Sequence, residues 1–238
     1  MASDHVGSLA VFGALSDDAR LIAFSRRGYG GSGAPEPYTG TTVQEQCEDA
    51  RAVLRALAPG GALVAGQGFG ALIALDLMLR YGGLVRGAVL TDPPLLAFVP
   101  DATRALADER GRIEQAVRDG GPGDGVDAWL TGHGGIERAG SAPPAGEPGS
   151  AAPGEAGRRD RARVATAAFF ADYAGLASWP VTRGELRSIA APLVVLTGAA
   201  SAAHITAAAD ALAALAPNAT RRHDGELEDA VRSLLAGL

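Results

Sequence analysis

The chain has 238 residues, of which 47% are hydrophobic, enough for one sizeable α/β domain with a buried core. Its formal net charge of −6 argues against general nucleic-acid binding, which needs a basic surface. The single cysteine, Cys47, excludes an internal disulfide and favours the cytoplasm, and no stretch has the pattern of a signal peptide or a membrane span. All 21 basic residues are arginine, which, with 33 glycines, suggests a GC-rich bacterial source.

The first part of the chain alternates predicted strands and helices. We expect a short helix at residues 8–15, a strand at 20–25 and a loop at 26–35. Thr42 and Glu45 have the spacing of a capping box, in which each side chain satisfies the other residue's backbone amide. The helix that they open ends before Pro59 and Gly60.

The central stretch is the glycine-rich turn at residues 66–70. A short apolar run before it predicts a buried strand, and the apolar run at 71–81 predicts a buried helix. Such a strand–turn–helix unit presents one residue at the top of a parallel sheet. That residue is Gly68, which has no side chain.

A third predicted strand, at residues 85–92, ends at Pro93. From about 100 to 186 the strands cease: we expect helices at 101–118 and 158–173, and a flexible tract at 139–157, where alanine, glycine, proline and serine prevail. A strand at 191–198, a helix, a weak edge strand at 220–223 and a last helix follow. Strands that alternate with helices predict a parallel sheet of βαβ units.

Four segments together resemble the α/β-hydrolase superfamily: the strand and loop at 20–33, the turn at 66–70, and the strands with their flanks at 89–94 and 192–198. The resemblance implies an α/β-hydrolase-like parallel sheet flanked by helices, with a helical cap inserted. It places the core at residues 1–99 and 187–238 and the cap at 100–186.

The residues that carry serine-hydrolase chemistry are not where the resemblance implies them. The nucleophile position is Gly68, residues 199–201 offer no acid, and the loop before the last helix, 224–228, has no histidine. His223 comes a few residues early. Because a serine hydrolase needs all three groups, we expect a non-hydrolytic enzyme such as a lyase, isomerase or cyclase. The alternatives are an inactive binding or scaffold protein and a hydrolase with a displaced triad.

The family's sheet also has a strand before the first helix, and this chain begins too late to supply it. Either the true start lies upstream or the sheet closes differently. A gap would expose two apolar strand edges. We therefore keep a homodimer as a possible partner arrangement.

A ligand site is expected where the strands end at the carboxyl edge of the sheet. The predicted ligand-binding residues are Ser25, Gly66, Gln67, Gly68 and Phe69. Asp92 is the candidate catalytic residue, although a cap before Pro93 explains it equally well. Because Gly68 leaves the floor of the pocket open, we expect a small, mostly apolar molecule as ligand.

One rival interpretation is a nucleotide-binding protein, because Gly66, Gly68 and Ala71 satisfy Gly-x-Gly-x-x-Ala and Asp92 ends the next strand. A hydrolase-type strand and loop before the turn speak against it. The four histidines and Cys47 show no metal-ligand spacing, so we expect neither a metal nor a cofactor. His133, His204 and His223 are expected to be surface residues.

Overall fold

The computed structural model describes residues 15–100, 102–132, 155–224 and 226–237. Its contacts divide the chain into two compact units. The first contains residues 40–103 and 171–238, and the second contains residues 2–39 and 104–170. The domain boundaries expected from the sequence, at 99/100 and 186/187, stay a prediction.

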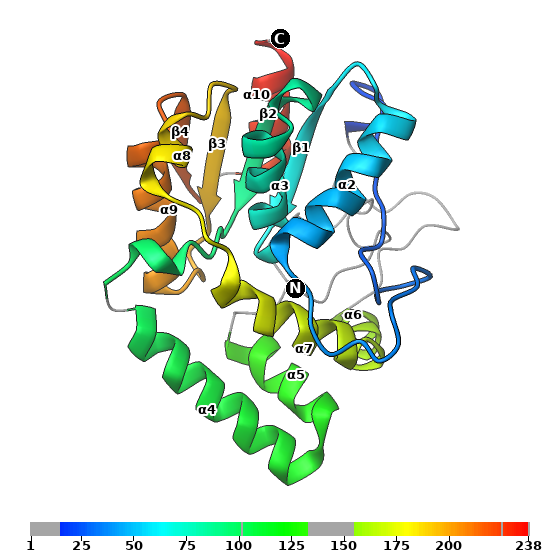
Figure 1. Cartoon of the computed structure of the whole chain (residues 1–238). Coiled ribbons are helices and arrows are strands. Elements are labelled where there is room, and N and C mark those ends of the chain that lie inside the picture. The colour runs from blue at the N-terminus through cyan, green and yellow to red at the C-terminus, as the bar shows by residue number, and fades with distance from the viewer. Residues whose placement is uncertain (1–14, 101, 133–154, 225, 238) are drawn as a thin grey trace. The chain divides into compact units, whose positions relative to one another are not determined.

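The first unit is built on a parallel sheet of four strands in the order β1-β2-β3-β4 (Figure 1). The strands are β1 (Ala62–Gln67), β2 (Val85–Thr91), β3 (Leu193–Thr197) and β4 (Ala219–His223). All three pairings are parallel. The expected strands around 62, 85, 191 and 220 are thus present, and their carboxyl ends meet at one edge.

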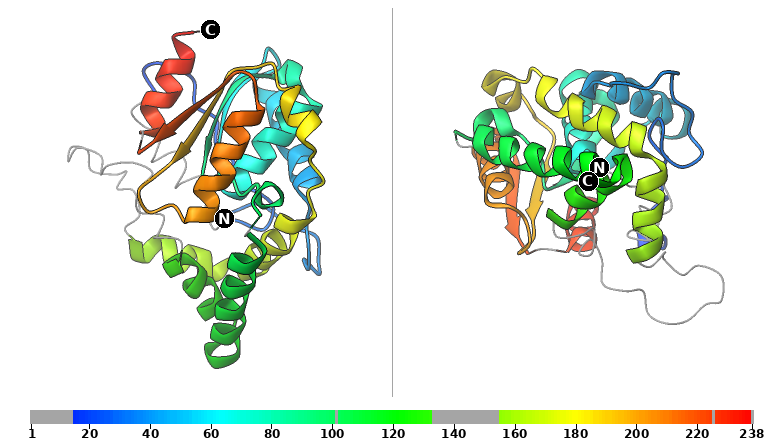
Figure 2. Two further views of the ribbon diagram at one scale, coloured as in Figure 1. Left: turned by 90° about the vertical axis from the view of Figure 1, so that its left-hand side faces the viewer. Right: turned by 90° about the horizontal axis from the view of Figure 1, so that it is seen from below.

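Helices cover both faces of this sheet (Figure 2). On one face, α2 (Val43–Leu57), α3 (Phe69–Arg80) and α9 (Ala203–Leu215) share a core with Leu90 and Val195. On the other face, α10 (Leu227–Leu235) packs Ala230 and Leu234 against Val89 and Val194. The alternation of side chains along β2 and β3 therefore supplies both cores. The five-residue α8 (Arg183–Arg187) precedes β3.

Three short 3-10 helices complete this unit, at Gly82–Leu84, Leu96–Phe98 and Leu176–Ser178. Helix α3 is the most deeply buried helix segment, with nine of its twelve residues buried. Its apolar sequence on all sides is what a helix between a sheet and a second helix requires. The first residue of this central helix follows Gly68 directly.

The second unit contains four helices in the described part of the chain. They are α4 (Ala102–Gly120), α5 (Pro122–Gly132), α6 (Glu155–Val164) and α7 (Thr166–Gly175), of which α4 begins and α7 ends in the first unit. The ring of Phe169 meets Trp129 and Phe170 edge-on at 5.5 and 5.2 Å. Arg163 of α6 pairs with Asp124 and Asp127 of α5.

Two sequence expectations are wrong. Residues 20–25 form no strand but an irregular segment. A strand requires backbone bonds to a partner strand, whereas local hydrogen bonds shape this segment: Ser32 Oγ donates to the Ser25 carbonyl at 2.6 Å, and the Gly28 amide donates to the Gly33 carbonyl at 3.2 Å. The helix expected at 158–173 is two helices, α6 and α7, which meet at Ala165, where the amide is shared between the carbonyls of Arg161 and Ala162.

Other expectations fall partly outside the described residues. These are the helix at 8–15, except Leu15, and the flexible tract at 139–157, except its last three residues, which belong to α6.

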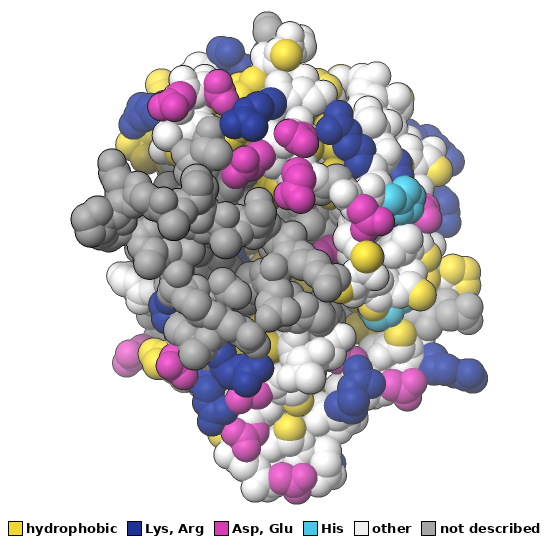
Figure 3. Space-filling model, turned by 180° about the vertical axis from the view of Figure 1, so that it is seen from behind, with side chains coloured by type: hydrophobic (Ala, Val, Ile, Leu, Met, Phe, Trp, Pro, Cys, Tyr) yellow, Lys and Arg dark blue, Asp and Glu magenta, His cyan; other side chains and the backbone are white. Residues whose placement is uncertain are grey.

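No helix among the described residues is both long and apolar enough to span a membrane. On the face opposite that of Figure 1, the described acidic and arginine side chains are interspersed rather than grouped by sign (Figure 3).

Candidate functional site

The turn between β1 and α3 reverses the chain within one residue. Gly68 has φ 55° and ψ −120°, a region that side-chain-bearing residues occupy only under strain. Its amide donates to the Thr91 carbonyl at 2.9 Å, and its carbonyl accepts from the Ala71 amide at 3.0 Å. These bonds place residue 68 at the carboxyl edge, with the backbone geometry of a nucleophile elbow but no nucleophile.

The glycines on either side of Gly68 have different reasons to be there. A Cβ on Gly66 would lie 2.3 Å from the Gly70 carbonyl oxygen and 2.8 Å from the Ala71 nitrogen. Apart from its chain neighbours and the backbone of its own helix, no described atom lies within 4 Å of a Cβ placed on Gly70. Gly66 is thus required by the close approach of strand and helix, whereas Gly70 has room for a side chain.

Asp92 follows β2 directly and also has an unusual backbone, with φ 49°. Its amide donates to the Leu196 carbonyl at 3.0 Å, and its Oδ1 accepts a hydrogen bond from Ser201 Oγ at 2.5 Å. Ser201 Oγ in turn accepts from the Gly198 amide at 2.9 Å. The half-buried carboxylate is therefore oriented by the loop that follows β3.

The structure brings five of the six predicted site residues together at this edge. They are Gly66, Gln67, Gly68, Phe69 and Asp92. Because the Gly68 amide binds the carbonyl of the residue before Asp92, the two residues continue neighbouring strands, whose spacing is about 4.8 Å. Ser25 is buried in the other unit, and its place beside this edge stays a prediction.

The sequence did not predict the contacts that two residues, Ser201 and Arg221, make at this edge. Ser201 lies at the position expected for an acid and instead binds the Asp92 carboxylate. Arg221 of β4 contacts Thr197 Oγ1 at 2.6 Å and the ring of His223 at 3.3 Å. The one signal for Ser201 is its position four residues after β3, since the ends of neighbouring parallel strands share an edge.

The histidines singled out in the sequence lie in different places. His204 lies half-buried in the first turn of α9, and His133 is outside the described residues. His223 is exposed and is the last residue of β4, opposite Thr197. Within the described ranges, no group of three or more histidine, cysteine or acidic residues could hold a metal ion.

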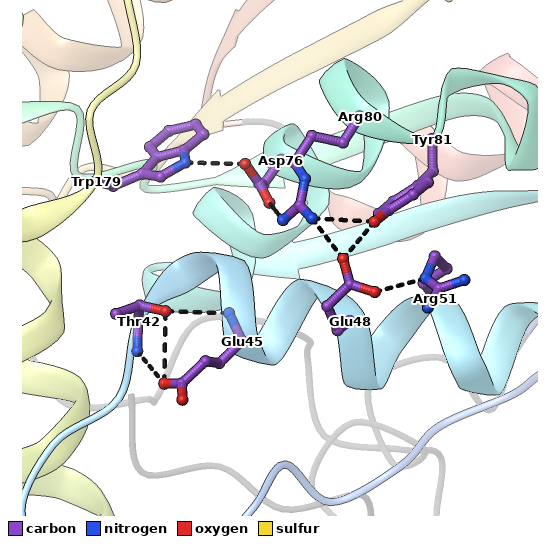
Figure 4. A network of polar contacts seen from close by, with 8 residues as sticks. All are labelled: Thr42, Glu45, Glu48, Arg51, Asp76, Arg80, Tyr81 and Trp179. Atoms are coloured by element: carbon purple, nitrogen blue, oxygen red, sulfur yellow. Dashed lines mark hydrogen bonds and ion pairs between the residues drawn. The ribbon is translucent and has the colours of Figure 1, made fainter.

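A second polar cluster links α2, α3 and Trp179 (Figure 4). The buried Asp76 accepts from Trp179 Nε1 at 3.0 Å and from Arg80 at 3.1 Å. Arg80 and the Tyr81 hydroxyl both donate to Glu48 of α2. Arg80 lies eleven residues along α3 from its start, roughly 16 Å at 1.5 Å per residue, so this end of the cluster is remote from the edge.

This cluster shifts the pKa values of several groups, among them those of Cys47 and Glu48. Burial, and then the hydrogen bond with Asp76, raise the pKa of the Cys47 thiol far above its usual range. The hydrogen bond from Tyr81 lowers the pKa of Glu48. A protonated buried thiol is a poor nucleophile, so we interpret the cluster as a structural link between α2 and α3.

The chain matches a family model described as "Alpha/beta hydrolase family" over residues 3–230. A 2-(acetamidomethylene)succinate hydrolase of Mesorhizobium japonicum is 30% identical over 120 residues, 50% of this chain and 40% of that protein. The match thus spans less than half the length of that relative.

Solved structures show the same fold. A hydrolase from Pseudomonas aeruginosa aligns with a TM-score of 0.72 at 19% identity, over 98% of this chain and 86% of that one. An alpha/beta hydrolase from Sphaerobacter thermophilus aligns with a TM-score of 0.68 at 22% identity, over 99% and 88%. With the family model covering nearly the whole chain, the protein belongs to the α/β-hydrolase family.

Proposed function

We propose that this protein is a small-molecule enzyme that works without an elbow nucleophile and uses Asp92 to transfer a proton. The reaction is then of the lyase, isomerase or cyclase type. The observation that carries the proposal is the Asp92 carboxylate, oriented by Ser201 at 2.5 Å next to the strand end that bears Gly68.

A glycine at position 68 cannot form an acyl-enzyme, because it has no hydroxyl. In this proposal a small, mostly apolar substrate lies against the backbone of the turn, with no side chain of residue 68 between them. The N-terminus of α3, which starts at Phe69, carries the positive end of the helix dipole and favours negative charge on a substrate oxygen. If this oxygen belongs to a substrate carbonyl, Asp92 removes a proton from the carbon next to that carbonyl. General-base catalysis of this kind contributes about 10²–10⁴-fold in rate.

A displaced hydrolytic site is the second candidate. The Ser201 hydroxyl already donates to Asp92, so the carboxylate could accept the serine proton during attack on an ester. The relative from Mesorhizobium japonicum is named a hydrolase. The nucleotide-binding alternative finds no support in the family match. If Asp92 transfers no proton, a binding or scaffold role is the remaining alternative.

The test is proton exchange, since exchange reports proton abstraction even when no product forms. A panel of aryl-substituted β-keto esters and 2-oxo acids is incubated with the protein in D₂O, and deuterium at the α-carbon is measured by NMR. We expect enzyme-dependent exchange that falls at least about 100-fold in Asp92→Asn. Asp224→Asn is the matched control, because Asp224 also follows a strand at this edge and has φ 53°.

Exchange that persists unchanged in Asp92→Asn refutes the proposal. Fluorophosphonate labelling of Ser201, with p-nitrophenyl acetate turnover lost in Ser201→Ala, supports the displaced hydrolase instead. Ligand binding with neither exchange nor labelling supports the binding role.

A further inference from the structure

Arg221 has an extensive hydrogen-bond network at the carboxyl end of β4. Its side chain is only 13% exposed and donates to Asp210 of α9 at 2.8 Å, to the Val195 carbonyl at 3.3 Å and to Thr197 Oγ1 at 2.6 Å. Its remaining contacts are the Arg222 carbonyl and Nδ1 of His223, the latter at 3.3 Å. The guanidinium is therefore fixed from several sides.

This fixed position determines how the His223 ring carries its proton. A guanidinium has only N–H donors and no acceptor. The Arg221–His223 hydrogen bond consequently requires that Nδ1 of His223 accept, so that the neutral ring carries its proton on Nε2. A triad histidine has the opposite arrangement, in which Nδ1–H donates to the acid and Nε2 is the base.

His223 also lies at the edge where the ligand is proposed to bind. Arg221 and His223 are two residues apart on β4 and hence on the same face of the strand. His223 pairs in register with Thr197, which continues to Gly198 and the Ser201 loop. Two strand spacings, roughly 10 Å, separate the ends of β4 and β2.

We propose that His223 is a hydrogen-bond donor, through Nε2–H, to a carboxylate oxygen of the ligand, and that Arg221 is the residue that positions it. The inference rests on the proposed site at this edge and extends it to a substrate class: an apolar molecule with a reactive carbonyl near Asp92 and a carboxylate some 10 Å away. The Nε2–H donor is the group that selects such an anion, while Arg221, whose charge is paired with that of Asp210, holds the ring in place.

The first test reads the ring directly in the unmodified protein. Two-dimensional ¹⁵N–¹H NMR, with the His223 signals assigned by their loss in His223→Gln, should show a protonated Nε2 and an unprotonated Nδ1 at neutral pH. In Arg221→Met the ring should become a mixture of tautomers. In Arg222→Met, which removes an arginine of the same strand whose side chain donates to Ser233 rather than to His223, it should not change. A protonated Nδ1 in the wild-type protein overturns the proposal.

The second test uses benzoate as probe, with benzyl alcohol as the uncharged counterpart. We expect benzoate to shift the His223 Nε2 signals saturably and benzyl alcohol to leave them unchanged. An unprotonated Nδ1 without any benzoate response overturns the donor role. Both measurements are independent of proton transfer by Asp92, so the two proposals can fail separately.

Discussion

At the scale of single residues, the carboxyl edge depends on backbone conformations that most side chains avoid. Gly68 with φ 55°, Asp92 with φ 49° and Asp224 with φ 53° each follow a strand of the same sheet. Positive φ values in non-glycine residues cost about 1–3 kcal/mol and recur at functional sites. Two of these three positions, Asp92 and Asp224, carry a carboxylate, whereas Gly68 carries no side chain. The functional groups at these positions are therefore carboxylates alone.

Placing a serine at the elbow should destabilise the protein. A side chain at φ 55° and ψ −120° is strained whatever space surrounds it, so we expect Gly68→Ser to lower the free energy of unfolding by about 1–3 kcal/mol, measured by urea denaturation. Gly70→Ser is the matched control. A Cβ there meets no atom within 4 Å, and its effect should stay within about 0.5 kcal/mol. Equal effects of the two substitutions would contradict the elbow argument.

The thiol of Cys47 should make stability fall at alkaline pH. Burial raises its pKa in the folded state, so above the ordinary thiol pKa of 9.0 the unfolded chain releases a proton that the native protein retains. The stabilising contribution is therefore complete below that pH and declines as the pH rises. Unfolding free energies measured between about pH 8 and 10 should decline more steeply in the wild type than in Cys47→Ala.

The same thiol offers an independent check. Because it is completely buried, it should react with Ellman's reagent only after unfolding. Rapid reaction in the native protein would show that the thiol is accessible. Parallel pH curves for the wild type and Cys47→Ala would show that folding does not raise the pKa of the thiol.

At the scale of secondary structure, helix starts are set by local hydrogen bonds. Thr42 before α2 and Thr182 before α8 both form complete capping boxes, each with a glutamate three residues later. In contrast, α3 has Gly68 before it and no side-chain cap. The start of α3 therefore depends on its packing against the sheet rather than on a side-chain cap.

The cap of α2 can be tested by removing the hydroxyl of Thr42. The Glu45 amide donates to Thr42 Oγ1 at 3.1 Å, and Thr42→Ala removes this acceptor. We expect a loss of about 0.5–2 kcal/mol in unfolding free energy by urea denaturation. Thr42→Ser keeps the hydroxyl and should cost only a few tenths of a kcal/mol. If serine and alanine destabilise alike, the cap is not the cause.

At the scale of the whole molecule, each compact unit combines segments that are distant in the chain. In the second unit, a Cβ on Gly28 would come within 2.8 Å of the Ala168 side chain, 140 residues later. In the first, Trp179 binds Asp76. Such contacts order the chain only after the loops between them have closed.

Stability should therefore be uneven across the sheet. Strands β2 and β3 have a partner on each side, whereas β4 is paired in the described structure with β3 alone. We expect the amides of Val89, Leu90 and Val195 to exchange with deuterium more slowly than those of Thr220 and Arg222, as measured by NMR. Exchange from β4 as slow as from β3 would indicate a further partner on that edge.

The sequence alone determined most elements and the family. Hydrophobic periodicity, the Thr42–Glu45 box and the glycines around residue 68 are local signals, because the side chains involved are neighbours along the chain. They predicted all four strands of the sheet and the helices α2, α3, α4, α9 and α10. The ligand site at the carboxyl edge, with Gly68 and Asp92, stays a prediction. The expected homodimer and cytoplasmic location stay predictions.

Only the tertiary structure decided which side chains meet. Residues 20–25 have the composition of a strand, yet they form none, because composition cannot supply a hydrogen-bonding partner. Ser201 reaches Asp92 over 109 positions, and Arg221 reaches Thr197 over 24, through strand order and register. The tautomer that we propose for His223 likewise rests on its contact with Arg221, which the strand alternation brings to the same face.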